Sequence, residues 1–391
     1  MPAAWRRVLH RLAEDVEADL DRRVRRAKRA LGEADPVHAV PYRGYATGGR
    51  LVLGGRVLEV EARPEAERDR LWHDLVRLYR WLESDEVPAA SLTARWRAEE
   101  RSLTSDDEGY FRFEIEGGPP RDERLAWHPV EVDLLAPLAP GQEKPVRAIG
   151  EVVVPAADAL FAVVSDLDDT VVETGATSAL KMARTVFLHN ARTRTPFPGV
   201  AAFYRALELG PSGARPRNPV FYLSSSPWNL YPLFIGFLAH QEIPRGPIFL
   251  RDLGLRPDLG IGPGHEEHKL GHLRRLLDDF PDLPFVLVGD SGQQDPEIYA
   301  HLIAGLGDEA PRRIRAVYIR DVTPDPRDAQ VNELARQALG RGVAMALVPD
   351  TATAARHAAE LGLIPPDAVA EVAEDRRREK LEGEVLDGLL G

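Results

Sequence analysis

An acidic cluster directly follows a run of mostly apolar residues in the stretch LFAVVSDLDDTVVETG, which begins at Leu160. The cluster contains Asp166, Asp168 and Asp169. Carboxylates this close repel one another, so a bound cation, a proton or a chemical role must offset the repulsion if they converge.

The cluster has two possible non-catalytic explanations. An EF-hand calcium loop starting at Asp166 would need Gly at its sixth position and Glu at its twelfth, but these positions are Val171 and Thr177. The calcium loop is excluded. The second explanation, an acidic turn after a strand, is not excluded by the cluster alone. The residues at other strand ends bear on it.

Three more segments of the chain carry reactive or charged groups in a fixed order. Ser224 ends an apolar run, and its hydroxyl can donate to a phosphoryl oxygen while the amides that follow open a helix whose N-terminus favours an anion. Lys269 can supply a point charge that screens an anionic nucleophile from an anionic substrate. Asp290 ends another apolar run, and Asp295 begins the next helical segment. Together with the cluster at Asp166, these segments give four strand or helix ends that carry Asp/Asp, Ser, Lys and Asp/Asp in a fixed order.

The elements that must position these groups alternate between strands and helices from Leu160 onward. Continuous apolar strands separated by helices predict a doubly wound, mostly parallel sheet, in which ligands bind at the carboxyl ends of strands. The predicted strands are 160–165, 219–224, 284–289, 314–319 and 342–348. The predicted helices are 199–208, 228–241, 266–280, 295–306, 327–340 and 351–361, with a charged helix or tail at 374–388.

A different pattern precedes this half. Alternating runs at 50–60, 91–100, 110–116, 130–137 and 146–154 predict a small antiparallel sandwich or barrel, with a hairpin tip at 105–109 and one helix over 64–83.

Residues 2–31 predict an amphipathic helix with a basic later half, RRVRRAKR. This helix either lies on a membrane surface or docks its apolar stripe on the protein.

Composition limits the classes of function. With 391 residues the chain is long enough for two domains, and its net charge of −12 argues against bulk nucleic-acid binding. It contains no cysteine, which excludes disulfides, thiolate nucleophiles and cysteine zinc sites. No apolar run suits a transmembrane anchor or a signal peptide, so we expect a cytoplasmic protein.

The order DxDxT, strand-terminal Ser, Lys and GDxxxxD resembles the signature of the phosphatase branch of the haloacid dehalogenase superfamily. More narrowly, the segments PYRGY at 41–45, RVLE at 56–59, SDLDDTV at 165–171, SSSPWNLY at 224–231 and GDSGQQDPEIY at 289–299 are similar to phosphatidate phosphatases of the actin-patch-protein type and their bacterial relatives. This likeness extends over most of the chain.

The resemblance implies an α/β fold: a haloacid-dehalogenase-like, Rossmannoid, doubly wound parallel sheet with small caps. A smaller β-rich, sandwich-like domain and the N-terminal amphipathic helix precede it. The expected divisions are an N-terminal helix at 1–35, a β-rich module at 36–155, a phosphatase domain at 156–365 and a charged helix or tail at 366–391.

The resemblance also implies roles for the signature residues. Asp166 is the expected nucleophile that forms an aspartyl-phosphate, and Asp168 the acid and base that protonates the leaving alkoxide and activates water. Thr170 braces Asp168 or its loop, and Ser224 and Lys269 hold the phosphoryl oxygens. Asp169 is expected to be a surface acid or a structural loop contact. The expected cofactor is Mg²⁺, with ligands from Asp166, Asp168, Asp290 and Asp295.

Two features bear on the substrate. The segments between Thr170 and Ser224, with a helix predicted at 177–189, and between Ser224 and Lys269 leave no room for a large cap, which favours a bulky substrate or a partner that closes the site. The candidate substrate-binding residues are Ser225, Ser226, Trp228 and Tyr231, although aromatic residues more often pack inward.

Three functional hypotheses follow. The first is a Mg²⁺-dependent phosphatidate phosphatase that makes diacylglycerol and contacts the inner membrane surface through the N-terminal helix. The second is a phosphatase of the same mechanism for a phosphoprotein or a soluble phosphate ester. The third is a non-catalytic scaffold or binding protein. Nucleic acid is not an expected partner, and the oligomeric state is left open.

Overall fold

The computed structural model describes residues 35–59, 85–119, 121–122, 124–167, 198–251, 265–322 and 325–390. The helices predicted at 2–31, 64–83 and 177–189 lie outside these ranges. Within the described ranges, no helix is both long and apolar enough to cross a bilayer.

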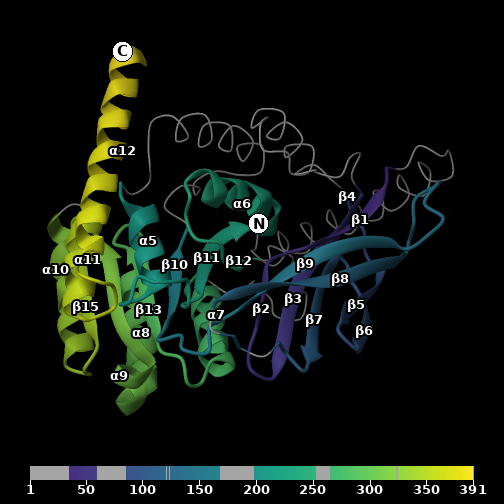
Figure 1. The fold of residues 1–391 in the computed structure, drawn as a ribbon, viewed down its shortest axis with the longest axis horizontal. Helices are drawn as coiled ribbons and strands as arrows, with labels where there is room; N and C mark the ends of the chain where they lie inside the picture. The colour runs from purple at the N-terminus through teal and green to yellow at the C-terminus, as the bar shows by residue number, and fades with distance from the viewer. Residues whose placement is uncertain are drawn as a thin grey trace, which may run out of the picture. The chain divides into compact units, whose positions relative to one another are not determined.

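The C-terminal half forms a six-stranded parallel sheet with the order β12-β11-β10-β13-β14-β15. Its strands are β10 (Ala162–Asp166), β11 (Val220–Pro227), β12 (Ile248–Arg251), β13 (Phe285–Asp290), β14 (Ile314–Arg320) and β15 (Ala344–Val348). The chain therefore builds outward from β10 in one direction, returns, and builds in the other from β13. The prediction of a mixed α/β architecture with a parallel sheet is confirmed (Figure 1).

Both faces of this sheet are covered by helices, which explains why its strands are apolar along their length. On one face, α7 (His265–Asp279), α8 (Asp295–Leu306) and α10 (Asp325–Leu339) contribute buried residues to a core that includes Val164, Leu287 and Val317. On the other face, α5 (Val200–Leu209) and α11 (Thr351–Glu360) approach Val288 and Tyr318. Because side chains alternate along a strand, Leu287 and Val288 point to opposite faces.

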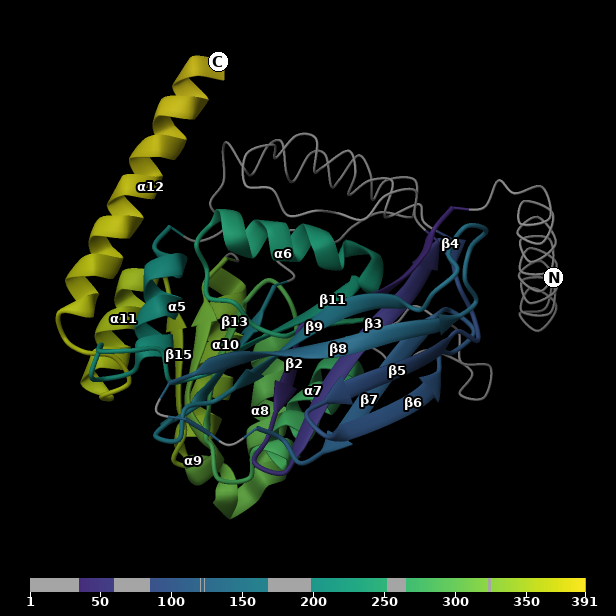
Figure 2. The same cartoon turned by 45° about the vertical axis from the view of Figure 1, so that its right-hand side comes forward.

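The remaining helical elements complete this half (Figures 1 and 2). They are η3 (Trp228–Leu230), α6 (Tyr231–His240), η4 (Gly307–Glu309), α9 (Ala310–Arg313) and α12 (Ala368–Leu390).

The described strands of the earlier part join one nine-stranded sheet. They are β1 (Val37–Pro41), β2 (Gly44–Ala46), β3 (Arg50–Glu59), β4 (Asp85–Glu86), β5 (Ser91–Trp96), β6 (Glu99–Thr104), β7 (Tyr110–Glu116), β8 (Ala126–Ala136) and β9 (Val146–Val154). The order is β1-β3-β2-β9-β8-β5-β6, with β4 and β7 also paired to β3. The pairing path is thus open at β1 and β6 within the described residues, and does not close into a barrel.

Two local predictions in this sheet were wrong. The run 91–100 was taken as one strand, but β5 ends at Trp96 and pairs antiparallel with β6 across a turn in which Arg97 has a φ of 54°. The turn at 105–109 does form, with Gly109 N donating to Asp106 O, but it is not a hairpin tip, because β6 pairs with β5 whereas β7 pairs with β3.

The chain divides into two compact units. The first contains residues 1–41, 54–113 and 130–150, and its described core includes Val57, Leu92 and Val132. The second contains residues 42–53, 114–129 and 151–391, and it holds the parallel sheet. Every residue of the site described below lies in this second unit.

Candidate active site

Three carboxylates meet at the carboxyl end of the parallel sheet. Asp166 ends β10, Asp290 ends β13, and Asp295 begins α8. One carboxylate oxygen from each lies within 4.8 Å of the others. Adjacent strands β10 and β13 run parallel, so their last residues reach the same edge of the sheet. The convergence of these predicted residues is therefore a direct result of the sheet topology.

Lys269 from α7 lies between two of these carboxylates. Its Nζ is 2.6 Å from Asp166 Oδ1 and 2.8 Å from Asp295 Oδ1. The side chains of Asp166, Lys269 and Asp295 are 3%, 1% and 0% exposed. A buried ammonium needs such partners, since an unpaired charge in the protein interior is costly. Three carboxylates outnumber one ammonium, so these four side chains together favour a further cation when all are ionised.

The loop of residues 291–294 sets the orientation of Asp290. Its Oδ1 accepts hydrogen bonds from the backbone amides of Gly292, at 2.7 Å, and Gln293, at 3.1 Å. The amide of Asp290 itself donates to Asp295 Oδ2 at 3.3 Å. Both acidic side chains are thus connected to the backbone that joins them.

Gly289 allows Asp295 to approach β13. A Cβ atom at this position would lie 2.5 Å from Asp295 Oδ2 and 2.7 Å from Asp295 Cβ. Any larger residue would displace the buried carboxylate.

The predicted serines lie near the end of β11, the strand that neighbours β10. Ser224 is fully buried, and its Oγ accepts a hydrogen bond from the Ser226 amide at 3.0 Å. Ser226 is 1% exposed, and its hydroxyl has no hydrogen-bond partner among the residues that the structure describes. Ser225 is half-buried. Buried hydroxyls normally have partners, so the Ser226 hydroxyl is suited to bind a ligand oxygen.

The two predicted substrate-binding aromatic residues belong to a cluster. Trp228, which is half-buried, stacks on Tyr42 with ring centroids 4.3 Å apart and an interplanar angle of 7°. Tyr231 is buried, and its hydroxyl accepts a hydrogen bond from the Arg43 amide at 2.7 Å. Burial raises the pKa of Tyr231 to about 12. Tyr231 therefore holds the segment that contains Tyr42, while Trp228 stays partly exposed.

A serine and a tyrosine support the backbone at Asp166. The Ser165 hydroxyl donates to the carbonyl of Asp166 at 3.0 Å and lies 2.6 Å from the Tyr204 hydroxyl. Because the single Ser165 proton is used in the first bond, the Tyr204 hydroxyl is the donor in the second. Burial raises the pKa of Tyr204 to about 12, so this donor keeps its proton at neutral pH.

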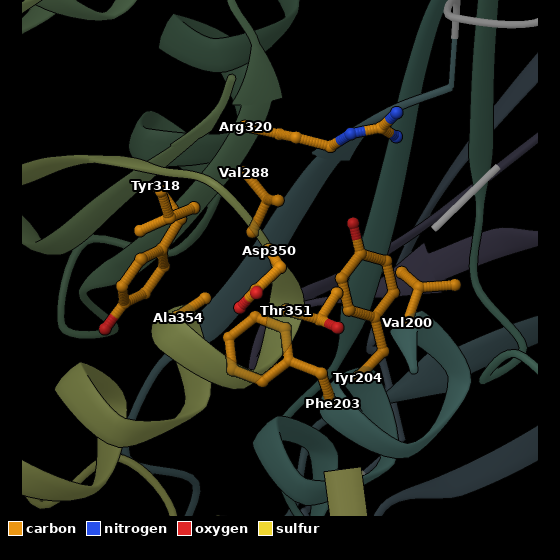
Figure 3. Close-up of a pocket in the computed structure, with 10 residues that line it drawn as sticks. Val200, Phe203, Tyr204, Val288, Tyr318, Arg320, Asp350, Thr351 and Ala354 are labelled. Carbon is orange, nitrogen blue, oxygen red and sulfur yellow. The ribbon is translucent and has the colours of Figure 1, made fainter. Parts of the chain in front are cut away.

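A small cavity of about 20 Å³ lies beside Tyr204, between α5, α11 and the ends of β13, β14 and β15 (Figure 3). The Tyr204 hydroxyl points toward the side where the Arg320 guanidinium lies (Figure 3). The cavity has room for about one water molecule. None of the predicted site residues lines it.

Not every predicted site residue can be placed. Asp168, Asp169 and Thr170 lie outside the described residues. Of those that are described, Asp166, Lys269, Asp290 and Asp295 come together as four adjoining groups.

Sequence reasoning missed Ser165, Gly289 and Tyr204. Gly289 stood within the quoted GDxxxxD motif, where a small residue directly before the aspartate was the available signal.

Comparison with known proteins agrees with this geometry. The family model described as "Phosphatidate phosphatase APP1, catalytic domain" matches residues 161–321, a range that contains every signature residue from Asp166 to Asp295. Residues 161–321 are thus similar to the APP1 catalytic-domain family.

Two fungal relatives each match part of the chain. Phosphatidate phosphatase APP1 of Saccharomyces cerevisiae is 32% identical over 158 residues, which are 40% of this chain and 25% of the yeast protein. An uncharacterized protein of Schizosaccharomyces pombe is 31% identical over 168 residues, 42% of this chain and 26% of its own length. The chain thus spans about a quarter of the length of these relatives.

Among solved structures, a carbohydrate acetylesterase from Xanthomonas citri aligns over 75% of this chain and 71% of its own, with 11% identity and a TM-score of 0.23. A similarity of this size bears on neither fold nor function.

Proposed function

We propose that the protein is a Mg²⁺-dependent phosphatidate phosphatase that hydrolyses phosphatidate to diacylglycerol and phosphate. The observation that carries this proposal is the contact of Asp166 with Lys269 at 2.6 Å, at the carboxyl end of a parallel sheet, within a range that matches the APP1 catalytic domain. The proposed fold is the Rossmannoid fold of the haloacid dehalogenase superfamily, and the reversal of strand order between β10 and β13 supports it.

In the proposed mechanism, the Asp166 carboxylate attacks phosphorus in line and displaces the alkoxide, which gives an aspartyl-phosphate. Lys269 lowers the repulsion between this carboxylate and the phosphate dianion, and it holds Asp166 in one orientation. The Ser224 and Ser226 hydroxyls, near the end of the neighbouring strand β11, bind the phosphoryl oxygens.

The proton transfers are assigned to Asp168. As the carboxylic acid it protonates the leaving alkoxide, and as the carboxylate it takes a proton from the water that hydrolyses the aspartyl-phosphate. Thr170 braces this residue. Both assignments rest on the DxDxT motif.

The described carboxylates fit Mg²⁺. Its proposed ligands are Asp166, Asp290 and Asp295, whose oxygens lie within 4.8 Å of one another, together with the Asp168 backbone carbonyl. When bound, Mg²⁺ supplies the positive charge that offsets the negative charge of substrate and nucleophile. Oxygen donors and excess negative charge are the preferences of this hard cation.

The lipid preference and the location are also part of the proposal. The half-buried Trp228, four residues after Ser224, is suited to contact a bulky leaving group. The predicted basic helix within residues 1–35 is the proposed contact with an anionic membrane surface on the cytoplasmic side. Such contact brings the site to a substrate that stays in the bilayer.

The test is phosphate release from phosphatidate vesicles, lysophosphatidate and an aryl phosphate, each with Mg²⁺, with chelator and with Asp166→Asn. We expect phosphatidate to be favoured, and both chelator and variant to abolish turnover. Turnover of the aryl phosphate alone would support phosphatase activity and refute phosphatidate as the substrate. No turnover of any substrate would favour the scaffold hypothesis.

Deletion of residues 1–32 then tests the membrane contact. Activity on vesicles should fall more than activity on the aryl ester. Equal activities of the deleted and full chains on vesicles would remove the membrane role and leave the phosphatase assignment intact.

A further inference from the structure

The side chain of Arg327, near the start of α10, reaches across to the loop of residues 291–294. Its Nε donates to Ser291 O at 3.1 Å, and its Nη2 donates to Gln293 O at 2.9 Å. This loop joins Asp290 to Asp295. One guanidinium therefore binds two carbonyls of the loop that connects Asp290 with Asp295.

The same guanidinium is itself held in place by Glu297. Nη1 and Nη2 donate to the two carboxylate oxygens of Glu297 at 2.6 and 2.8 Å. Glu297 lies in the first turn of α8, the helix that Asp295 begins. Paired guanidinium and carboxylate groups of this geometry are rigid, and the Arg327 side chain is 22% exposed. Arg327 thus ties the loop to the helix that carries Asp295.

The conformation of the loop decides where the carboxylates lie. Asp290 Oδ1 is oriented by amides of Gly292 and Gln293, and Gln293 is also a residue whose carbonyl Arg327 binds. A shift of this peptide would move the Asp290 carboxylate with it. The Ser291 hydroxyl, which accepts from the Val322 amide at 3.0 Å, holds the loop from the β14 side.

We propose that Arg327 is a positioning residue for the acidic site, which holds the loop of residues 291–294 so that Asp290 and Asp295 are preorganised for a divalent cation. It acts on Asp290 and Asp295 indirectly, through its hydrogen bonds to the loop carbonyls and to Glu297. The inference rests on the proposed function, in that it assumes these carboxylates bind Mg²⁺.

The experiment measures Mg²⁺ binding directly, by isothermal titration calorimetry on the full chain without substrate. Arg327→Gln should raise the dissociation constant for Mg²⁺ about tenfold or more, as removal of groups that orient metal ligands does elsewhere. Arg327→Lys should have a similar effect, because a lysine keeps the charge but cannot make the forked contacts. The matched control is Arg336→Gln, on the same helix, where the arginine pairs with exposed Glu333.

Two further measurements separate positioning from folding. Raising Mg²⁺ should restore turnover of Arg327→Gln toward that of the wild-type protein, and thermal unfolding without Mg²⁺ should show that the variant is folded at the assay temperature. Glu297→Gln should weaken Mg²⁺ binding as well, and the double variant should be little worse than either single one, because both act through one unit.

The outcomes are distinct for the two proposals. If Arg327→Gln and Arg327→Lys bind Mg²⁺ as the wild-type and control proteins do, the positioning role is refuted and the proposed function stands. If the wild-type protein binds no Mg²⁺, the metal-dependent function and the inference both fall.

Discussion

Lys269 Nζ lies 2.6 Å from Asp166 Oδ1, and each side chain is at least 97% buried. The lysine also contacts Asp295, so it shares its charge between the proposed nucleophile and a proposed metal ligand. Removing this one group would change the charge of the whole site.

Lys269→Met should abolish turnover and lower the stability of the protein. The variant leaves Asp166 and Asp295 buried without their cation, and such losses cost about 3–5 kcal/mol. Steady-state kinetics and thermal unfolding measure the two effects. Lys144→Met, at an exposed position, is the control and should change neither. A wild-type melting temperature for Lys269→Met would contradict the pairing.

Gly289→Ala should disrupt the site from within the strand. The added Cβ would overlap the buried Asp295 carboxylate, and we expect a loss of about 1–3 kcal/mol together with weaker Mg²⁺ binding. The control is Gly305→Ala in α8, where a Cβ would meet no atom within 4 Å. That change should stabilise the helix by about 0.5–1 kcal/mol. Equal Mg²⁺ affinities of the two variants would show that Asp295 tolerates displacement.

Tyr204→Phe should lower kcat strongly while changing the free energy of unfolding only slightly. It removes the donor to Ser165, whose hydroxyl binds the Asp166 carbonyl, and we expect kcat to fall about ten- to a hundredfold. Tyr222→Phe is a matched control, because the buried Tyr222 hydroxyl donates to Pro244 O at 2.7 Å instead. Both variants should lose about 1 kcal/mol of stability. A kcat for Tyr204→Phe equal to that of Tyr222→Phe would refute the supporting role.

Glu208 should make the protein less stable as the pH rises from about 5 to 7. Burial raises the pKa of Glu208 to about 7 from an ordinary value of 4.5. Between these values the folded state keeps the proton that the unfolded state releases, so stability present below pH 4.5 is lost as the pH passes through 7.

Chemical denaturation across this pH range should show a loss of about 1–2 kcal/mol, discounted for partial exposure of the side chain. Glu208→Gln should remove most of this slope, whereas Glu116→Gln, at an exposed position of β7, should leave it unchanged. If Glu208→Gln shows the same dependence of unfolding free energy on pH as the wild-type protein, another titratable group causes that dependence.

The parallel sheet was predictable where the strands are continuous and apolar. The five predicted strands all form. Their continuous apolar runs suit strands whose two faces are both buried by helices. Strand β12 was missed because its four residues, IFLR, lie beside Pro247 and carry too little periodicity for a prediction.

Pairing in the nine-stranded sheet was harder to predict for a physical reason. A turn such as 105–109 has the residues of a hairpin tip, yet β7 pairs with β3, which is distant in sequence. Local turn chemistry does not specify which strand a segment joins, since cross-strand packing decides it.

The acidic site was predictable to the extent that its groups lie at strand ends. Asp166, Asp290 and Asp295 follow from motif order and topology. Arg327 and Tyr204 do not, because each acts through contacts with residues far away in the chain, and arginine or tyrosine in a helix has no distinctive local pattern.

The placement of Lys269 and Asp295 has a consequence for the order of folding. They are 26 residues apart and lie in consecutive helices around β13, so the Lys269–Asp295 pair closes a short loop of chain. Asp166 comes from β10, a strand far earlier in the chain that lies between β11 and β13 in the sheet. Its contact with Lys269 therefore joins segments that are distant in sequence, and the proposed nucleophile reaches the lysine only when β10 is in the sheet.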